Sequence, residues 1–196
     1  IANTEMNVVY NGIDNPVKIS VPGAAAKDLV VSLADPSQAT LTPDASKGAG
    51  HYIIKPKVSK GTITVNAAIR DGNTTRSMGS TSFRARPLPD PKIFLGKYEA
   101  GKGIPIGDLK AQKGPRVSYG PDFAFHMTTP KILKQTIDIT KVNGATGLEN
   151  RGPQWGADVM SYIQKAKPGC KITLTIEVSM PDNTKRSISS TFRITR

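Results

Sequence analysis

The residue types that most often carry chemistry are scarce in this chain. It has two histidines, His51 and His126, and one cysteine, Cys170. Each histidine lies in an apolar, strand-like run, and neither has a second histidine or a cysteine at the spacing of a zinc site. We therefore expect each histidine to lie on a strand face with an ordinary hydrogen bond, and we expect no metal site.

The parts of a nucleophilic triad are also missing. Cys170 follows a Pro-Gly pair and opens a strand-like run without a cysteine-protease signature, which favours a small buried residue. The glycine-rich stretches 48–50 and 101–103 lack the Gly-Lys-Ser/Thr ending of a phosphate loop and predict turns. The acidic residues are dispersed, without the pattern of a calcium loop. The sequence therefore predicts no catalysis and no cofactor, and an enzyme acting through His126 or Cys170 is the least favoured alternative.

The overall charge is strongly basic. Lys and Arg number 27 against 15 Asp and Glu, a formal net charge of +12. Residues 1–86 carry 10 basic and 6 acidic groups, and residues 87–196 carry 17 and 9, so the second half has the larger excess. A basic surface suits nucleic acid, an anionic membrane or an acidic protein. Because no run of four basic residues occurs, a solvated surface is the plainest interpretation, and we do not expect dedicated nucleic-acid binding.

Alternation with a period of two dominates the sequence. Apolar residues take every second position in runs over 17–21, 63–69 and 172–178. This pattern places one face of a strand in a core and the other face in water. Turns of the Asp-Asn-Pro, Asp-Gly-Asn and Pro-Asp-Asn type separate the strands. The sequence predicts a mainly β fold of immunoglobulin-like β-sandwiches, although the Cys-Trp-Cys signature of immunoglobulin domains is absent.

A proline-rich stretch divides the chain. Pro87, Pro89 and Pro91 fall within five residues. Prolines at this density cannot lie inside a sheet and favour an extended, semi-rigid connector. We predict one sandwich domain over residues 1–86, a linker over 87–91 and a second sandwich domain over 92–196.

An internal similarity supports this division. Without gaps, an offset of 109 aligns Ile63-Thr64 with Ile172-Thr173 and Phe83-Arg84 with Phe192-Arg193. Each copy predicts a hairpin that closes its domain. Convergent hairpin patterning could produce so short a match, but we favour the duplication of one sandwich module.

Helix is expected only in the second domain. Val159, Tyr162, Ile163 and Ala166 share one face of a predicted helix over about 157–167, which Pro-Gly then ends. A shorter helical turn is predicted over 108–113, with Gly114 as its terminator.

The single tryptophan, Trp155, has two interpretations. Its ring could pack at the entry to the predicted helix. Alternatively, Asn150, Arg151, Gln154 and Trp155 form an exposed contact site for a protein partner, because Trp and Arg are enriched at the energetic centres of interfaces. Packing is the plainer interpretation, and the four residues are the candidate partner-contact site.

Two stretches of the chain resemble a known family. Residues 6–23 read Met-Asn-Val-Val-Tyr-Asn-Gly-Ile-Asp-Asn-Pro-Val-Lys-Ile-Ser-Val-Pro-Gly. This run resembles the start of the third periplasmic domain of the GldM/PorM family, the gliding-motility and type IX secretion proteins of Bacteroidetes. The second half resembles the family's last domain, with Phe123-Ala124-Phe125 ahead of a long strand over 132–140, a Pro-Gly before an Ile-Thr-Leu strand, and a terminal Phe-Arg-Ile strand.

The resemblance implies a role in a larger assembly. Family members carry an amino-terminal transmembrane helix that pairs with GldL/PorL, and a dimeric periplasmic rod that reaches the GldK/GldN or PorK/PorN ring. By this resemblance the chain is the distal, force-transmitting part of the rod, a homodimer in the periplasm without nucleic-acid or small-molecule partners. The sequence shows no signal peptide or membrane span and starts at Ile1, so we expect a fragment whose anchor lies upstream. The alternative is a secreted or surface sandwich module that binds carbohydrate or another anionic polymer.

Overall fold

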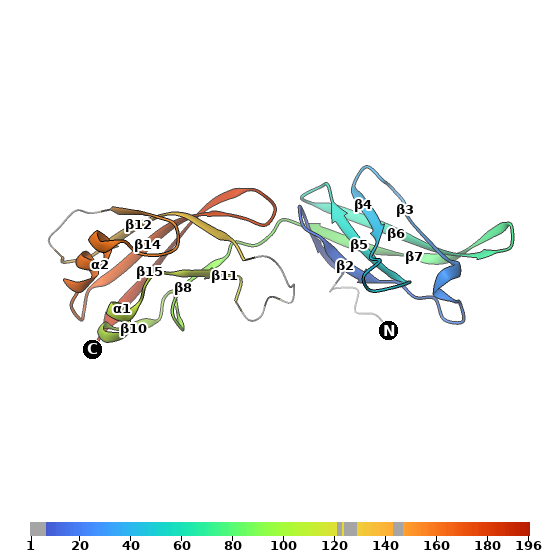
Figure 1. Cartoon of the computed structure of the whole chain (residues 1–196). Coiled ribbons are helices and arrows are strands. Elements are labelled where there is room, and N and C mark those ends of the chain that lie inside the picture. Colours follow the sequence, from blue (N-terminus) through green and yellow to red (C-terminus); the bar gives the residue numbers. More distant parts are fainter. Residues whose placement is uncertain (1–6, 121–122, 124–128, 143–146) are drawn as a thin grey trace. The chain divides into compact units, whose positions relative to one another are not determined.

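The computed structural model describes residues 7–120, 123, 129–142 and 147–196. His126 and residues 124–125 of the Phe-Ala-Phe run lie outside the described residues. The chain separates into two compact units, Ile1–Leu88 and Pro89–Arg196 (Figure 1). The division falls inside the predicted linker, where Leu88 and Pro91 are buried.

Strands make up most of the described chain. The first unit contains β1 (Val8–Tyr10), β2 (Asn15–Lys18), the 3-10 turn η2 (Ala26–Asp28), β3 (Leu29–Leu33), β4 (Ala39–Pro43), β5 (His51–Pro56), β6 (Gly61–Asp71) and β7 (Thr74–Arg86). The second unit contains β8 (Lys92–Leu95), β9 (Tyr98–Glu99), β10 (Gly103–Pro105), α1 (Ile106–Ala111), β11 (Arg116–Ser118), β12 (Lys131–Ile139), β13 (Leu148–Arg151), α2 (Ala157–Gln164), β14 (Lys171–Ser179) and β15 (Lys185–Thr195). The predicted mainly β class, with two short helices in the second unit, is confirmed.

The first unit is a sandwich of two sheets. One sheet has the order β1-β7-β6-β3 and the other the order β2-β5-β4. Side chains from both sheets meet in one core, which contains Val9, Ala39, Ile54, Ile63, Val65 and Ala85. Strand β1 pairs parallel with the end of β7, whereas β6 and β7 form a long antiparallel hairpin. The predicted alternation explains the core, because the inward positions of each strand carry apolar residues.

A buried asparagine links the two sheets. Asn15 is 1% exposed. Its Oδ1 accepts a hydrogen bond from the Tyr10 amide at 2.8 Å, and its Nδ2 donates to the carbonyls of Tyr10, Ile13 and Ile54 at 2.9–3.1 Å. A buried amide with these partners has its polar atoms satisfied. Asn15 therefore ties the end of β1 to β5 across the core.

The second unit has one large sheet and one small sheet. The large sheet has the order β10-β15-β14-β12-β13, and the small sheet has the order β11-β8-β9. The inward face of β14 is fully buried at Ile172, Leu174, Ile176 and Val178. Helix α2 lies beside this sheet, where the Tyr162 hydroxyl bonds the backbone of Ile139 on β12 (Figure 1).

The internal similarity extends to strand pairing. In the first unit Ile63 pairs with Phe83, and in the second Ile172 pairs with Phe192. The same offset of 109 relates every pair from Thr62–Arg84 through Ala67–Gly79 to its counterpart in β14–β15. In each unit a short strand, β1 or β10, pairs parallel with the end of the last strand. Shared register and shared strand order support duplication over convergence of one hairpin.

Both helices are shorter than, or shifted from, the sequence prediction. Helix α2 ends at Gln164 rather than Lys167, although Ala166 is still buried. Helix α1 covers residues 106–111 rather than 108–113, because the chain is already extended at Gln112. Gly114 therefore does not terminate the helix, and its role lies in a close approach described below.

Tyr119 should make the free energy of unfolding depend on pH. Its hydroxyl is buried without a hydrogen-bond partner among the described residues, and burial raises the pKa of Tyr119 to about 12. A raised phenol pKa contributes stability that is fully present below the unfolded value near pH 10 and is lost as pH rises through the folded value.

We expect Tyr119→Phe to leave the free energy of unfolding at pH 7 unchanged or slightly higher, because it removes an unpaired buried hydroxyl. Between pH 9 and 12 the variant should lose less stability than the parent. Urea unfolding across this pH range measures both effects, and parallel pH profiles would contradict the assignment.

Candidate docking surfaces

Local contacts explain why the pKa is lowered for three carboxyl groups. Hydrogen bonds from the side chains of Ser37 and Ser46 lower the pKa of Asp35 and Asp44, and the Lys92 ammonium does the same for Glu99. All three are surface groups in turns or ion pairs, rather than in a cleft. Within the described ranges, no three His, Cys, Asp or Glu side chains come together as metal ligands.

The sequence singled out Cys170 and His51 among the residues that could carry chemistry. Cys170 is buried, as expected for a packing residue. His51 lies on β5, but its Nδ1 is buried without a hydrogen-bond partner in the described part of the chain, so the expected ordinary bond is not formed at this atom. No helix among the described residues is both long and apolar enough to cross a membrane.

Trp155 packs inside the second unit. The side chain is 7% exposed, and its Nε1 donates to Oε1 of Gln135 at 3.0 Å. Gln135 is fully buried on β12, and its Nε2 donates to the Gly152 carbonyl. The structure thus agrees with the packing interpretation of Trp155, because the ring is buried within the second unit.

The loop before α2 is fixed at several points. Asn150 Nδ2 donates to the Gln154 carbonyl at 2.8 Å, and Asn150 Oδ1 accepts from the Gly156 amide at 2.9 Å. The Trp155 amide donates to the Lys113 carbonyl at 2.8 Å. At Gly114 an added Cβ would lie 2.1 Å from the Pro153 carbonyl oxygen, so only glycine permits this approach.

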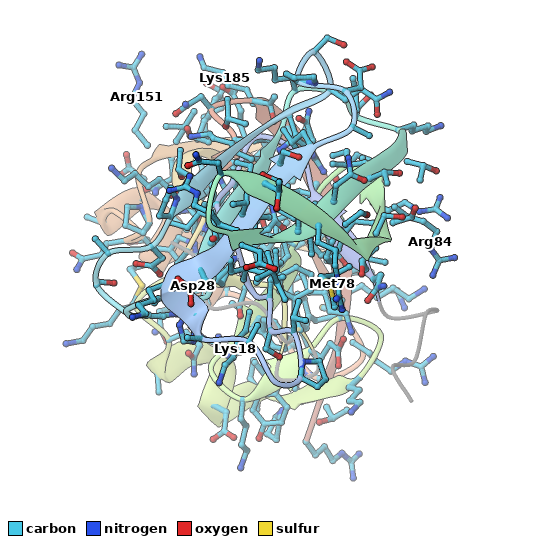
Figure 2. All side chains as sticks on the ribbon, turned by 90° about the vertical axis from the view of Figure 1, so that its right-hand side faces the viewer. Lys18, Asp28, Met78, Arg84, Arg151 and Lys185 are labelled. Carbon is cyan, nitrogen blue, oxygen red and sulfur yellow. The ribbon has the colours of Figure 1, made fainter. Side chains whose placement is uncertain are left out.

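These contacts present two of the four candidate side chains to solvent. Arg151 and Gln154 are exposed, and Figure 2 shows Arg151 extending away from the ribbon. The Asn150 side chain is hydrogen-bonded within the loop, and the Trp155 ring is buried in the core beneath it. The arrangement is a rigid loop with one cation and one amide on its outer side, which we call the 150–156 loop. A loop held in advance of binding loses little conformational entropy when a partner docks.

The first unit contains a groove with a mixed polar and apolar lining, which the sequence prediction missed. It has a volume of about 730 Å³ and runs between the segment from β2 to Pro22 and the middle of β7. Its lining includes Val65 and Ala67 of β6, Lys18 of β2 and Met78 of β7. Figure 2 labels Lys18 and Met78. A sign of this groove was present in the internal similarity, since Ala67 and Gly79 align with Ile176 and Ile188.

Comparison with known families assigns the first unit. Residues 1–86 match the family model described as the GldM third domain. The first unit therefore belongs to the family of GldM third domains. The GldM domain family implies a component of gliding-motility and type IX secretion machinery. None of the curated proteins compared with the chain matches it.

The family match gives a structural meaning to the opening run of the GldM-like unit. Tyr10, Ile13 and Asn15 all belong to the run that resembles the family, and Asn15 joins these positions by its hydrogen bonds. The side chain of Lys18 and the backbone beyond it form one wall of the groove. The recognisable run therefore builds the sandwich and one side of its groove, rather than a reactive centre.

Proposed function

We propose that this chain is a structural docking part of the GldM stalk in a type IX secretion and gliding machine. It joins an inner-membrane motor to an outer-membrane-associated ring and transmits force through its sandwich units. It lies in the periplasm, works as a homodimer, and belongs to a protein that an amino-terminal helix, outside this sequence, anchors in the inner membrane. Its partners are ring proteins of the GldK/GldN or PorK/PorN type, with GldL/PorL at the membrane.

The match of residues 1–86 to the GldM third domain carries this proposal. The fold is compatible with it, because paired sheets with continuous cores resist deformation better than loops do. The 150–156 loop supplies a fixed contact surface on the second unit, which also carries the larger basic excess. Basic groups near a docking site speed and orient association with an acidic partner more than they tighten it.

Binding to a purified ring tests the proposal. We expect the chain to bind a GldK/GldN-type ring complex saturably near physiological salt and more slowly as salt rises, because ions screen exposed charges. Arg151→Glu should lower the association rate about tenfold. Biolayer interferometry measures the association rates of the parent chain and of Arg151→Glu.

The matched control is Arg193→Glu, which makes the same charge change at an exposed position on β15. Equal slowing by both variants would show a general charge effect and would count against the 150–156 loop. Absence of binding by the folded parent chain would refute the docking role. Retention on a heparin column well above physiological salt, without ring binding, would instead favour a module for anionic polymers.

A further inference from the structure

The first described strand and the last strand of the first unit pair directly with each other. Strand β1 runs parallel to the end of β7, with Val8 opposite Arg84 and Tyr10 opposite Arg86. The chain passes through β1 at the start of this unit and leaves the unit after β7, just before the division at Leu88. Tension between the two ends of the unit therefore acts on one pair of neighbouring strands.

The parallel direction of these strands decides how tension loads them. A pull on the start of β1 and an opposite pull on the end of β7 both act along the strands and slide one past the other. All hydrogen bonds of the parallel ladder then carry the load together. The two ends of an antiparallel hairpin such as β6–β7 lie side by side, so a pull on them would open its bonds one after another.

Backbone hydrogen bonds close both ends of the β1–β7 ladder. The Arg84 amide donates to the Asn7 carbonyl at 2.8 Å, and the Asn11 amide donates to the Arg86 carbonyl at 2.9 Å. The paired residues 8–10 and 84–86 lie between these two bonds. The ladder is thus continuous from the residue before β1 to the residue after it.

A second attachment holds β1 from its other side. The Tyr10 amide and carbonyl both bond the side chain of Asn15, at 2.8 and 2.9 Å. The same side chain donates to the Ile54 carbonyl on β5, at 3.1 Å. Val9 and Ala85, which lie opposite each other in the ladder, are 1% and 2% exposed. Strand β1 is therefore bonded to both sheets, and on its core side water cannot readily replace a broken bond.

The second unit arranges the corresponding strands differently. Its short strand β10 pairs parallel with the end of β15, as β1 does with β7. However, β8 and β9 come before β10, and β8 lies in the small sheet whereas β15 lies in the large sheet. Among the described residues of this unit, no ladder joins the strand that enters to the strand that leaves.

We propose that the β1–β7 pair is a mechanical clamp, which keeps the first unit folded while force passes along the chain. The clamp raises the barrier to unfolding under tension, because its bonds must fail together. Forced unfolding is governed by the unfolding rate rather than by equilibrium stability. The first unit should therefore be the stronger of the two under tension between the chain ends. This inference rests on the force-transmitting role proposed above.

Single-molecule pulling of the full 196-residue chain tests the clamp. With handles at residues 1 and 196, the two units are told apart by the length that each releases, roughly 25 nm for residues 7–86 and roughly 35 nm for the second unit. We expect the second unit to unfold first and the first unit to unfold at the higher force.

A second attachment point bypasses the clamp in the same protein. Asp14→Cys provides an exposed handle just beyond the turn that follows β1, and Cys170→Ala removes the native thiol. From position 14, tension reaches the β1–β7 pair at the end where β1 stops, so its bonds can open one after another. We expect the unfolding force of the first unit to be at least about twofold lower than with the handle at residue 1 of this same variant.

Two proline variants locate the resistance. Asn11→Pro removes the amide that bonds the Arg86 carbonyl on β7, and Ala34→Pro removes the amide that bonds the Thr64 carbonyl on β6. Each amide lies one residue beyond the end of an edge strand, and both distances are 2.9 Å. Both variants should lower the urea midpoint similarly. Only Asn11→Pro should lower the unfolding force of the first unit with terminal handles.

The opposing results are distinct. Equal forces from the two attachment points, unfolding of the first unit before the second, or equal loss of force in both proline variants would overturn the inference. The attachment points decide the matter even where a proline variant does not fold. Ring binding by a chain whose first unit yields at low force refutes the clamp alone, whereas a strong first unit in a chain that does not bind the ring refutes the docking role.

Discussion

Replacement of Trp155 by alanine is expected to lower the free energy of unfolding of the second unit by about 3–5 kcal/mol. The side chain is 7% exposed, and its removal leaves a cavity at the base of the 150–156 loop. It also leaves Oε1 of the fully buried Gln135 without its hydrogen-bond donor. An unsatisfied buried acceptor adds to the cost of the lost packing. Urea unfolding followed by circular dichroism measures the loss.

The neighbouring Gln154→Ala provides the control. Gln154 is exposed, so its truncation should change the free energy of unfolding by less than about 0.5 kcal/mol. If Trp155→Ala were as mild as Gln154→Ala, the ring would not be the anchor of the loop. Folded Gln154→Ala with weaker ring binding would in turn support a direct contact from this loop.

Replacement of Phe192 by alanine is expected to cost the second unit about 3–5 kcal/mol, whereas Phe83→Ala should cost the first unit about 1–2 kcal/mol. The two residues occupy the same place in the repeat. Phe192 is fully buried, but Phe83 is half-buried and lines the groove. The difference in burial sets the difference in cost.

Fluorescence separates these two effects. Trp155 is the only tryptophan and lies in the second unit, so its emission follows the unfolding of that unit. Phe192→Ala should shift the tryptophan transition to lower urea, and Phe83→Ala should shift only a transition detected by circular dichroism. A tryptophan transition that moved equally in both variants would mean that the two units unfold as one cooperative body.

Local sequence patterns were sufficient for much of the fold. Alternating apolar residues such as Ile172 and Leu174 point to one face, so the strands and the core could be read directly. The offset of 109 marked both hairpins, and their register follows it. Helix ends were less accurate. The apolar face that includes Ala166 extended the predicted α2 to residue 167, whereas the Lys165 and Ala166 amides donate to carbonyls three residues back, as in a turn.

The candidate surfaces depend on contacts between distant residues. Gly114 was read as a helix terminator, but its requirement for glycine comes from the backbone at Pro153. Asn150 was read as an exposed anchor, but its side chain holds the loop to the start of α2. One signal was available, since Gln135 is a polar residue at an inward position of an apolar strand, which predicts a buried hydrogen-bond network.

A photo-reactive amino acid at position 154 of the native protein in living cells tests the docking role most directly. Gln154 is exposed on the fixed loop, so the substitution should not disturb the fold. We predict a light-dependent adduct with a ring component of the GldK/GldN type. Normal protein level and normal secretion without any ring adduct from this position would contradict the account.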